Sequence, residues 1–244
     1  LAIDSLEKEW KEHPVFHISF ATSNFTNYGS LETTIDAQLS DYEKIYGNDA
    51  KDTKDFGVRF RYLIRAAHEH TGQRVVVLID EYDKPLLDVM ATDIKAPTIN
   101  GDIKTLEDYN REILKGFYSV FKDADRDLKF VLLTGVTKFS QISVFSGFNQ
   151  PKDISNDARY EALCGITMDE MLTQFKEPIK ELGEMNGMTE EETIAKLKHK
   201  YDGYHFSKQM KDIFNPFSLL NCFDSKDFRD YWFSTGTPTY LMRL

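Results

Sequence analysis

The sequence VVVLIDEYDKPLL at residues 75–87 decides the fold. Its first five residues, 75–79, are apolar and mostly β-branched, which predicts a short strand buried on both faces, as in a parallel sheet. Carboxylates then follow at Asp80, Glu81 and Asp83. Because ligands of open α/β sheets bind beyond the carboxyl ends of strands, this abrupt acidic ending predicts a site there.

Strands and helices alternate on both sides of this stretch. Apolar runs at residues 15–20 and 128–133 predict two further strands. Between the strands, apolar residues recur at helical spacing over 56–67, where Gly72 is a natural stop, and again over 106–121. This alternation predicts an α/β fold with a largely parallel sheet flanked by helices.

The strand signal fades in the last third of the chain. Residues 168–186 and 189–201 have the pattern of helices, separated by a break at Asn186-Gly187. We therefore expect an α/β core over residues 1–156, followed by a mainly helical C-terminal subdomain over residues 157–244.

Composition excludes several classes of protein. Acidic residues outnumber basic ones by 40 to 30, and the resulting net charge of −10 repels a phosphate backbone, so nucleic acid is not indicated as a partner. No apolar stretch reaches the roughly 18 residues of a membrane span, and the N-terminus is charged where a signal peptide is apolar. We expect a cytoplasmic protein with no membrane partner. Cys164 and Cys222 have the spacing of neither a zinc site nor a disulfide framework.

The polar ends of two strands form the candidate site. Thr134 follows the strand at 128–133 as Asp80 and Glu81 follow the strand before it. Because carboxyl ends of parallel strands share one edge of a sheet, we expect Thr134 beside Asp80. A hydrated magnesium ion prefers a carboxylate, and an attacking water needs a second one as positioner or base. The alternative is an ordinary polar loop or the acidic first turn of a helix, but two polar strand ends of complementary chemistry favour a site.

Several longer blocks of the sequence resemble the AAA-ATPase-like family, a branch of the P-loop ATPases. The resemblance covers nearly the whole chain. It includes VLIDEYDKPLL at 77–87, FVLLTGVTKFS at 130–140, YDGYHF at 201–206, NPFSLLN at 215–221 and YWFSTGTPTYL at 231–241. The long blocks DEYDKPLL and LLTGVTKFS are the most specific.

The resemblance implies roles for the residues of the candidate site. Asp80 would be the Walker B residue that holds magnesium, and Glu81 the catalytic glutamate that orients the hydrolytic water. Thr134 would be a sensor-like polar group on the neighbouring strand. The implied cofactors of the intact protein are Mg²⁺ and ATP, and the implied activity is ATP hydrolysis, with the helical subdomain moving as a lid.

The chain departs from the family pattern at one motif. No GxxxxGK[ST] occurs in it, whereas the family has this phosphate-binding loop upstream of the strand at 15–20. We therefore expect an N-terminally truncated chain whose central P-loop strand is missing. Such a chain should be inactive alone and should bind no nucleotide.

The missing strand should leave a slot beside the strand at 128–133. Unpaired backbone groups in such a slot cost about 1–3 kcal/mol each. We therefore expect this strand to pair with another segment: residues 152–155, a separate polypeptide carrying the missing N-terminal part, or a second copy of the chain.

Two other functions stay open at this point. The first is a metal-dependent nuclease in which Asp80, Glu81 and Asp83 together hold divalent ions. The second is a non-catalytic interaction module. The family resemblance also implies that some relatives carry a nuclease domain beyond the end of this chain, where such an activity would lie.

Three other residues are weaker candidates. Arg126 and Arg159 could approach a phosphate as sensor or finger residues, but a surface salt bridge is the favoured interpretation of each. His205 lies among aromatic residues and has no partner at ligand spacing, so a structural histidine is favoured over a metal ligand.

Overall fold

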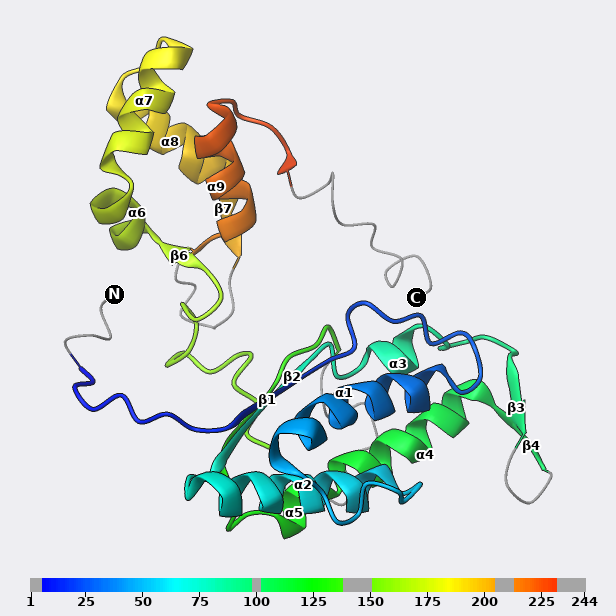
Figure 1. The fold of residues 1–244 in the computed structure, drawn as a ribbon. Helices are drawn as coiled ribbons and strands as arrows, with labels where there is room; N and C mark the ends of the chain where they lie inside the picture. Colours follow the sequence, from blue (N-terminus) through cyan, green and yellow to red (C-terminus); the bar gives the residue numbers. More distant parts are fainter. Residues whose placement is uncertain (1–5, 98–101, 138–150, 205–212, 232–244) are drawn as a thin grey trace. The chain divides into compact units, whose positions relative to one another are not determined.

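The computed structural model describes residues 6–97, 102–137, 151–204 and 213–231 (Figure 1), and the side chains of these residues except 202–204. The chain divides into two compact units, Leu1–Pro151 and Lys152–Leu244. Each unit has its own hydrophobic core and is described by itself.

A three-stranded parallel sheet forms the centre of the first unit. Its strands are β1 (Val15–Ser19), β2 (Val75–Asp80) and β5 (Leu128–Leu133), in the order β1-β2-β5. All three predicted strands are present, and the acidic stretch that follows β2 begins on the middle strand. In this register Ser19 pairs with Asp80, and Ile79 pairs with Leu133.

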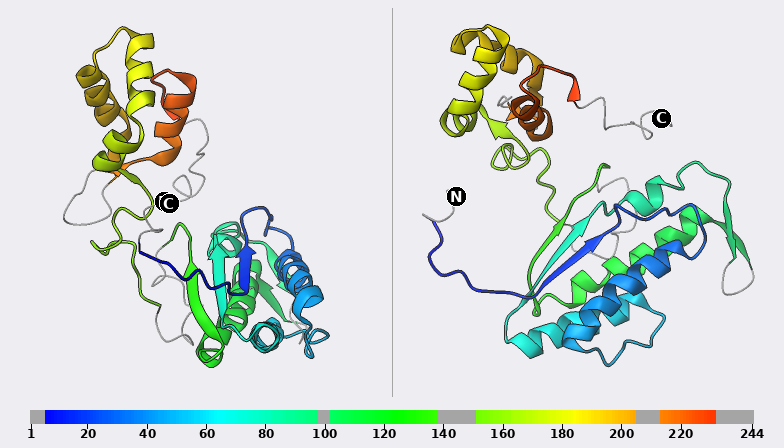
Figure 2. Two further views of the ribbon diagram at one scale, coloured as in Figure 1. Left: turned by 60° about the vertical axis from the view of Figure 1, so that its left-hand side comes forward. Right: turned by 45° about the horizontal axis from the view of Figure 1, so that its top comes forward.

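Four helices pack on one face of this sheet (Figures 1 and 2). They are α1 (Ser30–Tyr46), α2 (Phe56–Thr71), α4 (Leu106–Tyr118) and the short α5 (Val120–Asp123). Their apolar faces meet every second residue of β1 and β2 in a single core. That core includes Phe16, Ile18, Val75, Val77, Ile79, Leu39, Phe60, Leu63, Leu114 and Phe117.

Local signals set the ends of the two predicted helices. The Asp55 side chain accepts a hydrogen bond from the Val58 N–H at the start of α2, and Gly72 ends the helix in the left-handed conformation with φ of 67°. Thr105 caps α4 by accepting from the Asp108 N–H. The predicted helix over 106–121 is interrupted after Tyr118, so α4 and α5 are separate.

The prediction that β2 is buried on both faces is wrong for the described part of the chain. Val75, Val77 and Ile79 are at most 1% exposed, whereas the alternate residues Val76 and Leu78 are only half-buried. The helices therefore cover one face of the sheet, not both. A short apolar run predicts a strand but does not reveal whether a second layer covers it.

The β5 strand is at an edge of the sheet in the described part of the chain. It pairs with β2 on one side, and residues 152–155, which belong to the second unit, have no strand structure. The pairing of β5 with that segment, with another polypeptide or with a second copy stays a prediction. After β2 the chain forms the short helix α3 (Lys84–Leu87). An antiparallel hairpin of β3 (Lys95–Pro97) and β4 (Ile103–Thr105) follows it.

The second unit is mainly helical. It contains α6 (Met168–Gln174), α7 (Lys176–Asn186), α8 (Glu190–Tyr201) and α9 (Pro216–Ser225), with a small antiparallel sheet of β6 (Ile166–Thr167), β8 (Ile213–Phe214) and β7 (Asp202–Tyr204). Its core includes Leu182, Leu197, Phe214, Leu219 and Cys222. The predicted break at Asn186-Gly187 is the end of α7, where Gly187 has φ of 66°. No helix in the described ranges has both the length and the apolar composition that crossing a membrane requires.

Candidate functional site at the carboxyl ends of β2 and β5

Asp80 and Thr134 meet at the carboxyl edge of the sheet, as the sequence predicts. Thr134 Oγ1 donates a hydrogen bond of 2.6 Å to Asp80 Oδ1. The backbone also holds both residues, since the Thr134 N–H donates to the Ile79 carbonyl at 2.9 Å and the Phe20 N–H donates to the Asp80 carbonyl at 3.1 Å. The Asp80 carboxylate is therefore oriented from the neighbouring strand, and Thr134 itself is exposed.

Glu81 has an unusual backbone conformation. Its φ is 52°, in the left-handed region that costs a residue with a Cβ about 1–2 kcal/mol. Such strained residues persist only where the surrounding structure holds them in place, and they are found most often at functional sites. The turn is closed by the Lys84 N–H, which donates to the Glu81 carbonyl at 3.0 Å.

The Glu81 carboxylate also differs from its neighbours. Partial burial, with the nearby Asp80 charge as the next contribution, raises its pKa above the ordinary value. Within the described part of the chain, this carboxylate takes part in no hydrogen bond or ion pair. It is therefore available to a ligand or a water molecule.

Tyr82 connects the site to the loop after β5. Its N–H donates to the Thr134 carbonyl at 3.0 Å, and its hydroxyl donates to the Thr137 carbonyl at 2.6 Å. Its own carbonyl accepts from the hydroxyl of buried Tyr118 at 3.1 Å. Burial raises the pKa of Tyr118 well above its usual value, so this phenol remains a donor at all physiological pH values.

Asp83 points into the protein, away from a shared metal site. It is 1% exposed, and its Oδ2 accepts from the Val136 N–H at 2.9 Å and from the N–H and hydroxyl of Thr137, each at 2.6 Å. Among the residues with described positions, no three His, Cys, Asp or Glu side chains converge on a metal site. In this arrangement Asp83 does not share with Asp80 and Glu81 the metal site that the nuclease alternative predicts.

The remaining carboxylates suit a magnesium ion of the kind found in nucleotide sites. Such an ion is held by one or two carboxylates and keeps waters and phosphate oxygens as its other ligands. Asp80, oriented by Thr134, provides one carboxylate of this kind. The phosphates of a nucleotide would need further ligands, because the sequence contains no GxxxxGK[ST] loop whose N–H groups could bind them.

The two arginine candidates are engaged in salt bridges. The Arg126 side chain is 81% exposed, and its Nε lies 3.7 Å from Asp127 Oδ1. Arg126 stands just before the amino end of β5, whereas Asp80 is at the carboxyl end of β2. Arg159, in the second unit, donates two hydrogen bonds to Asp157, at 2.9 and 2.6 Å. The favoured salt-bridge interpretation is thus confirmed for both. His205 lies outside the described residues.

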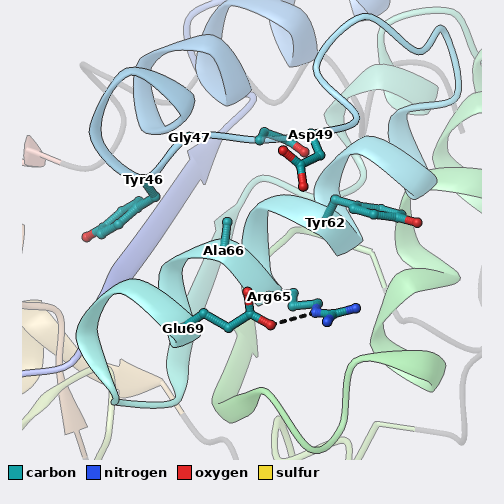
Figure 3. A pocket seen from close by; sticks show the side chains of 8 residues that line it. Tyr46, Gly47, Asp49, Tyr62, Arg65, Ala66 and Glu69 are labelled. Atoms are coloured by element: carbon teal, nitrogen blue, oxygen red, sulfur yellow. Dashed lines mark hydrogen bonds and ion pairs between the residues drawn. The ribbon is translucent and has the colours of Figure 1, made fainter.

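A surface cavity of about 240 Å³ lies elsewhere on the first unit (Figure 3). Its lining residues come from the end of α1, the loop after it and the outer face of α2, and none belongs to the carboxyl edge of the sheet. Arg65 and Glu69, one turn apart on α2, pair with each other at 2.7 Å and so neutralise each other's charge. Tyr46 and Tyr62 do not point toward each other in this view, so the cavity has no aromatic pair to enclose a ligand.

Sequence reasoning placed Asp80, Glu81 and Thr134 together but missed the part played by residues 82 and 83. Both residues hydrogen-bond to the segment from Thr134 to Thr137, more than 50 positions along the chain. Nothing in a local pattern of residues indicates such a contact. The short block TGVT at 134–137 was the available signal, because a glycine beside polar residues after a strand is typical of a close backbone approach.

Comparison with known proteins agrees with the resemblance found in the sequence. A family model, AAA-ATPase_like, described as a predicted AAA-ATPase, matches residues 1–145. The chain is also similar to an uncharacterized protein in the vnfD 5′ region of Azotobacter chroococcum mcd 1. The two are 40% identical over 237 residues, which make up 97% of this chain and 41% of that protein. The chain thus spans about two fifths of its relative's length. No solved structure matches it.

Proposed function

Because the chain belongs to the predicted AAA-ATPase family, we propose that the carboxyl edge of its sheet hydrolyses ATP in the whole natural protein. The observation that carries the proposal is the contrast between two adjacent carboxylates. Asp80 is held by Thr134, while Glu81 beside it has no side-chain partner in the described part of the chain. One carboxylate is fixed and the other is available, as a site for a metal ion and a water molecule requires.

Asp80 and Thr134 form the binding half of the proposed site. Hydrogen bonding to one carboxylate oxygen leaves Asp80 Oδ2 for a hydrated magnesium ion, which would neutralise charge on the phosphate oxygens. Thr134 is exposed, so its hydroxyl could also reach a bound phosphate. Thr134 would then link a bound phosphate to Asp80 through its hydrogen bond to that carboxylate.

Glu81 forms the catalytic half. A carboxylate with a raised pKa is a better proton acceptor than an ordinary glutamate, and it positions an attacking water more strongly. The left-handed backbone at this position is consistent with a conformation that function maintains against its cost in stability.

The phosphate-binding loop would come from another part of the whole protein. We propose that a segment outside these 244 residues contributes a P-loop and a strand, and that this strand pairs with the edge of β5. Two observations support this: β5 pairs on one side only in the described part of the chain, and the curated relative is more than twice as long as the matched region. By this proposal, the 244-residue chain alone neither binds nor hydrolyses ATP.

Removal of magnesium and substitution of Asp80 test the proposal in the whole natural protein. We expect ATP hydrolysis to stop when EDTA removes Mg²⁺, and Asp80→Ala to weaken Mg²⁺-dependent ATP binding by at least about tenfold, since a charge-assisted ligand is lost. The matched control is Asp125→Ala, an exposed carboxylate near the opposite end of β5. Binding and hydrolysis unaffected by Asp80→Ala would refute the assignment.

A further inference from the structure

The loop of residues 134–137, which begins with Thr134, is held against residues 82 and 83. Tyr82 supplies two donors, to the carbonyls of Thr134 and Thr137. The Asp83 carboxylate accepts from Val136 and twice from Thr137. Hydrogen bonds to an ionised acceptor are roughly twice as strong as neutral ones, so Asp83 provides the stronger half of this attachment.

Gly135 permits this close approach. A Cβ at this position would lie 2.5 Å from Tyr82 Cε1 and 2.7 Å from Asp83 Oδ1, distances that real Cβ atoms do not tolerate. The middle of the loop therefore rests directly on residues 82 and 83. Any other residue at this position would force a shift of the loop or of the Tyr82 and Asp83 side chains that hold it.

The second oxygen of Asp83 is unusual for a structural residue. Asp83 Oδ1 is buried and has no hydrogen-bond partner among the described residues. A buried carboxylate whose only task is stability normally has both oxygens satisfied. An unpaired oxygen on a fully buried side chain indicates that the position of this carboxylate serves something other than stability alone.

We propose that Asp83 is a positioning residue for the ATPase site: it holds the 134–137 loop so that Thr134 keeps its hydrogen bond to Asp80. This inference rests on the proposed function. Asp83 itself touches neither metal nor nucleotide, and it acts only through Thr134. A displacement of about 1 Å at a catalytic constellation can reduce a rate roughly a hundredfold, so releasing the loop should slow hydrolysis more than it weakens ATP binding.

The test compares Asp83→Ala, Asp83→Asn and Asp88→Asn in the whole natural protein, with ATP and Mg²⁺ as ligands. Asp88 is the matched control, because it is a carboxylate of the same region that accepts from Lys84 and the Phe25 N–H, neither of which belongs to the loop. Steady-state kinetics give kcat and KM separately. Hydrogen exchange of the peptide that contains residues 134–137, measured without nucleotide, reports on the loop independently of activity.

We expect Asp83→Ala to lower kcat roughly ten- to a hundredfold with a smaller rise in KM, because Thr134 also orients Asp80, and to speed exchange in the loop while β2 stays protected. Asp83→Asn should keep most of the wild-type kcat and most of the exchange protection of the loop, because the amide carbonyl oxygen still accepts from Val136 and Thr137. If Asp83→Ala does not fold, Thr137→Val, which removes only the hydroxyl donor, should show a smaller change in the same direction.

Three results would overturn the inference: kcat unchanged in Asp83→Ala, exchange raised equally throughout the first unit, or the same loss in Asp88→Asn. Failure of the proposed function is recognised separately. If Glu81→Gln hydrolyses ATP as fast as wild type, the assignment of the site fails whatever Asp83 does. If Glu81→Gln is slow and Asp83→Ala is not, only the role of Asp83 fails.

Discussion

Two clusters of charged residues in the first unit are built in opposite ways. Between α1 and α2, Arg59 is 4% exposed and donates to both oxygens of Glu43 at 2.7 Å, and also to Asp36 and to Ser40. At the carboxyl edge of the sheet, Glu81 has no side-chain partner in the part of the chain that the structure describes. The first cluster therefore stabilises the fold, whereas the second leaves one carboxylate available to a ligand.

The pKa values of two glutamates express the same contrast. Burial alone would raise the pKa of Glu43, but hydrogen bonds from Arg59 and Asn48 outweigh it and lower the pKa. The hydrogen bond with Glu43 in turn raises the pKa of Arg59. Burial and the Asp80 charge raise the pKa of Glu81. Folding therefore stabilises the charge on Glu43 and disfavours the charge on Glu81.

The largest expected effect is on stability, at the paired cluster. Arg59→Met should lower the free energy of unfolding by about 3–5 kcal/mol, because it leaves Glu43, whose side chain is only 9% exposed, without its charged partner. Urea unfolding of the 244-residue chain measures this. Arg65→Met is the matched control on the same helix, since its pair with Glu69 is exposed and should be worth about 1 kcal/mol or less. Equal losses in the two variants would contradict the account.

The next effect is a smaller gain in stability at Glu81, where the backbone is strained. Glu81→Gly should raise the free energy of unfolding by about 1 kcal/mol, because glycine adopts positive φ without steric cost. Ala91→Gly, at a φ of 56°, should give a comparable gain. The two variants should differ in the whole protein, where only Glu81→Gly abolishes ATP hydrolysis. A Glu81→Gly variant that keeps full activity would break the comparison.

The smallest expected effect is a pH dependence at the paired cluster. Because folding lowers the pKa of Glu43, its contribution to stability is present above its ordinary value of 4.5 and is lost as the pH falls through the lower, folded-state value. Wild type should therefore be more stable than Glu43→Gln at pH 7, and the gap should narrow as the pH falls below 4.5. Urea unfolding at a series of pH values measures the gap, and a gap that does not change with pH would count against this explanation.

The sequence was sufficient for the three strands of the parallel sheet and for the neighbourhood of the site, but it did not predict α1, α3 or the β3–β4 hairpin. The apolar runs predicted β1, β2 and β5 to within a residue at each end, and their polar ends placed Thr134 beside Asp80. Both follow from local rules, because strand periodicity and the shared edge of parallel strands need no knowledge of distant contacts.

Other features depended on contacts between distant segments. The position of Asp83, three residues after Asp80, suggests a metal ligand, but its carboxylate accepts hydrogen bonds from the loop after β5. Arg59 has the sequence context of an ordinary helix residue, and only the packing of α1 on α2 buries it. The uncovered face of β2 likewise depends on where the helices pack, which the apolar run does not encode.

The most direct test of the central claim is Glu81→Gln in the whole natural protein. Glutamine keeps the size of the side chain but cannot accept a proton from water. We predict that ATP binding in the presence of Mg²⁺ is retained and that hydrolysis slows about a hundredfold, the order of effect expected when a general base or water-positioning group is lost. Hydrolysis as fast as in wild type would contradict the assignment of Glu81, and with it the claim that the free carboxylate is the catalytic one.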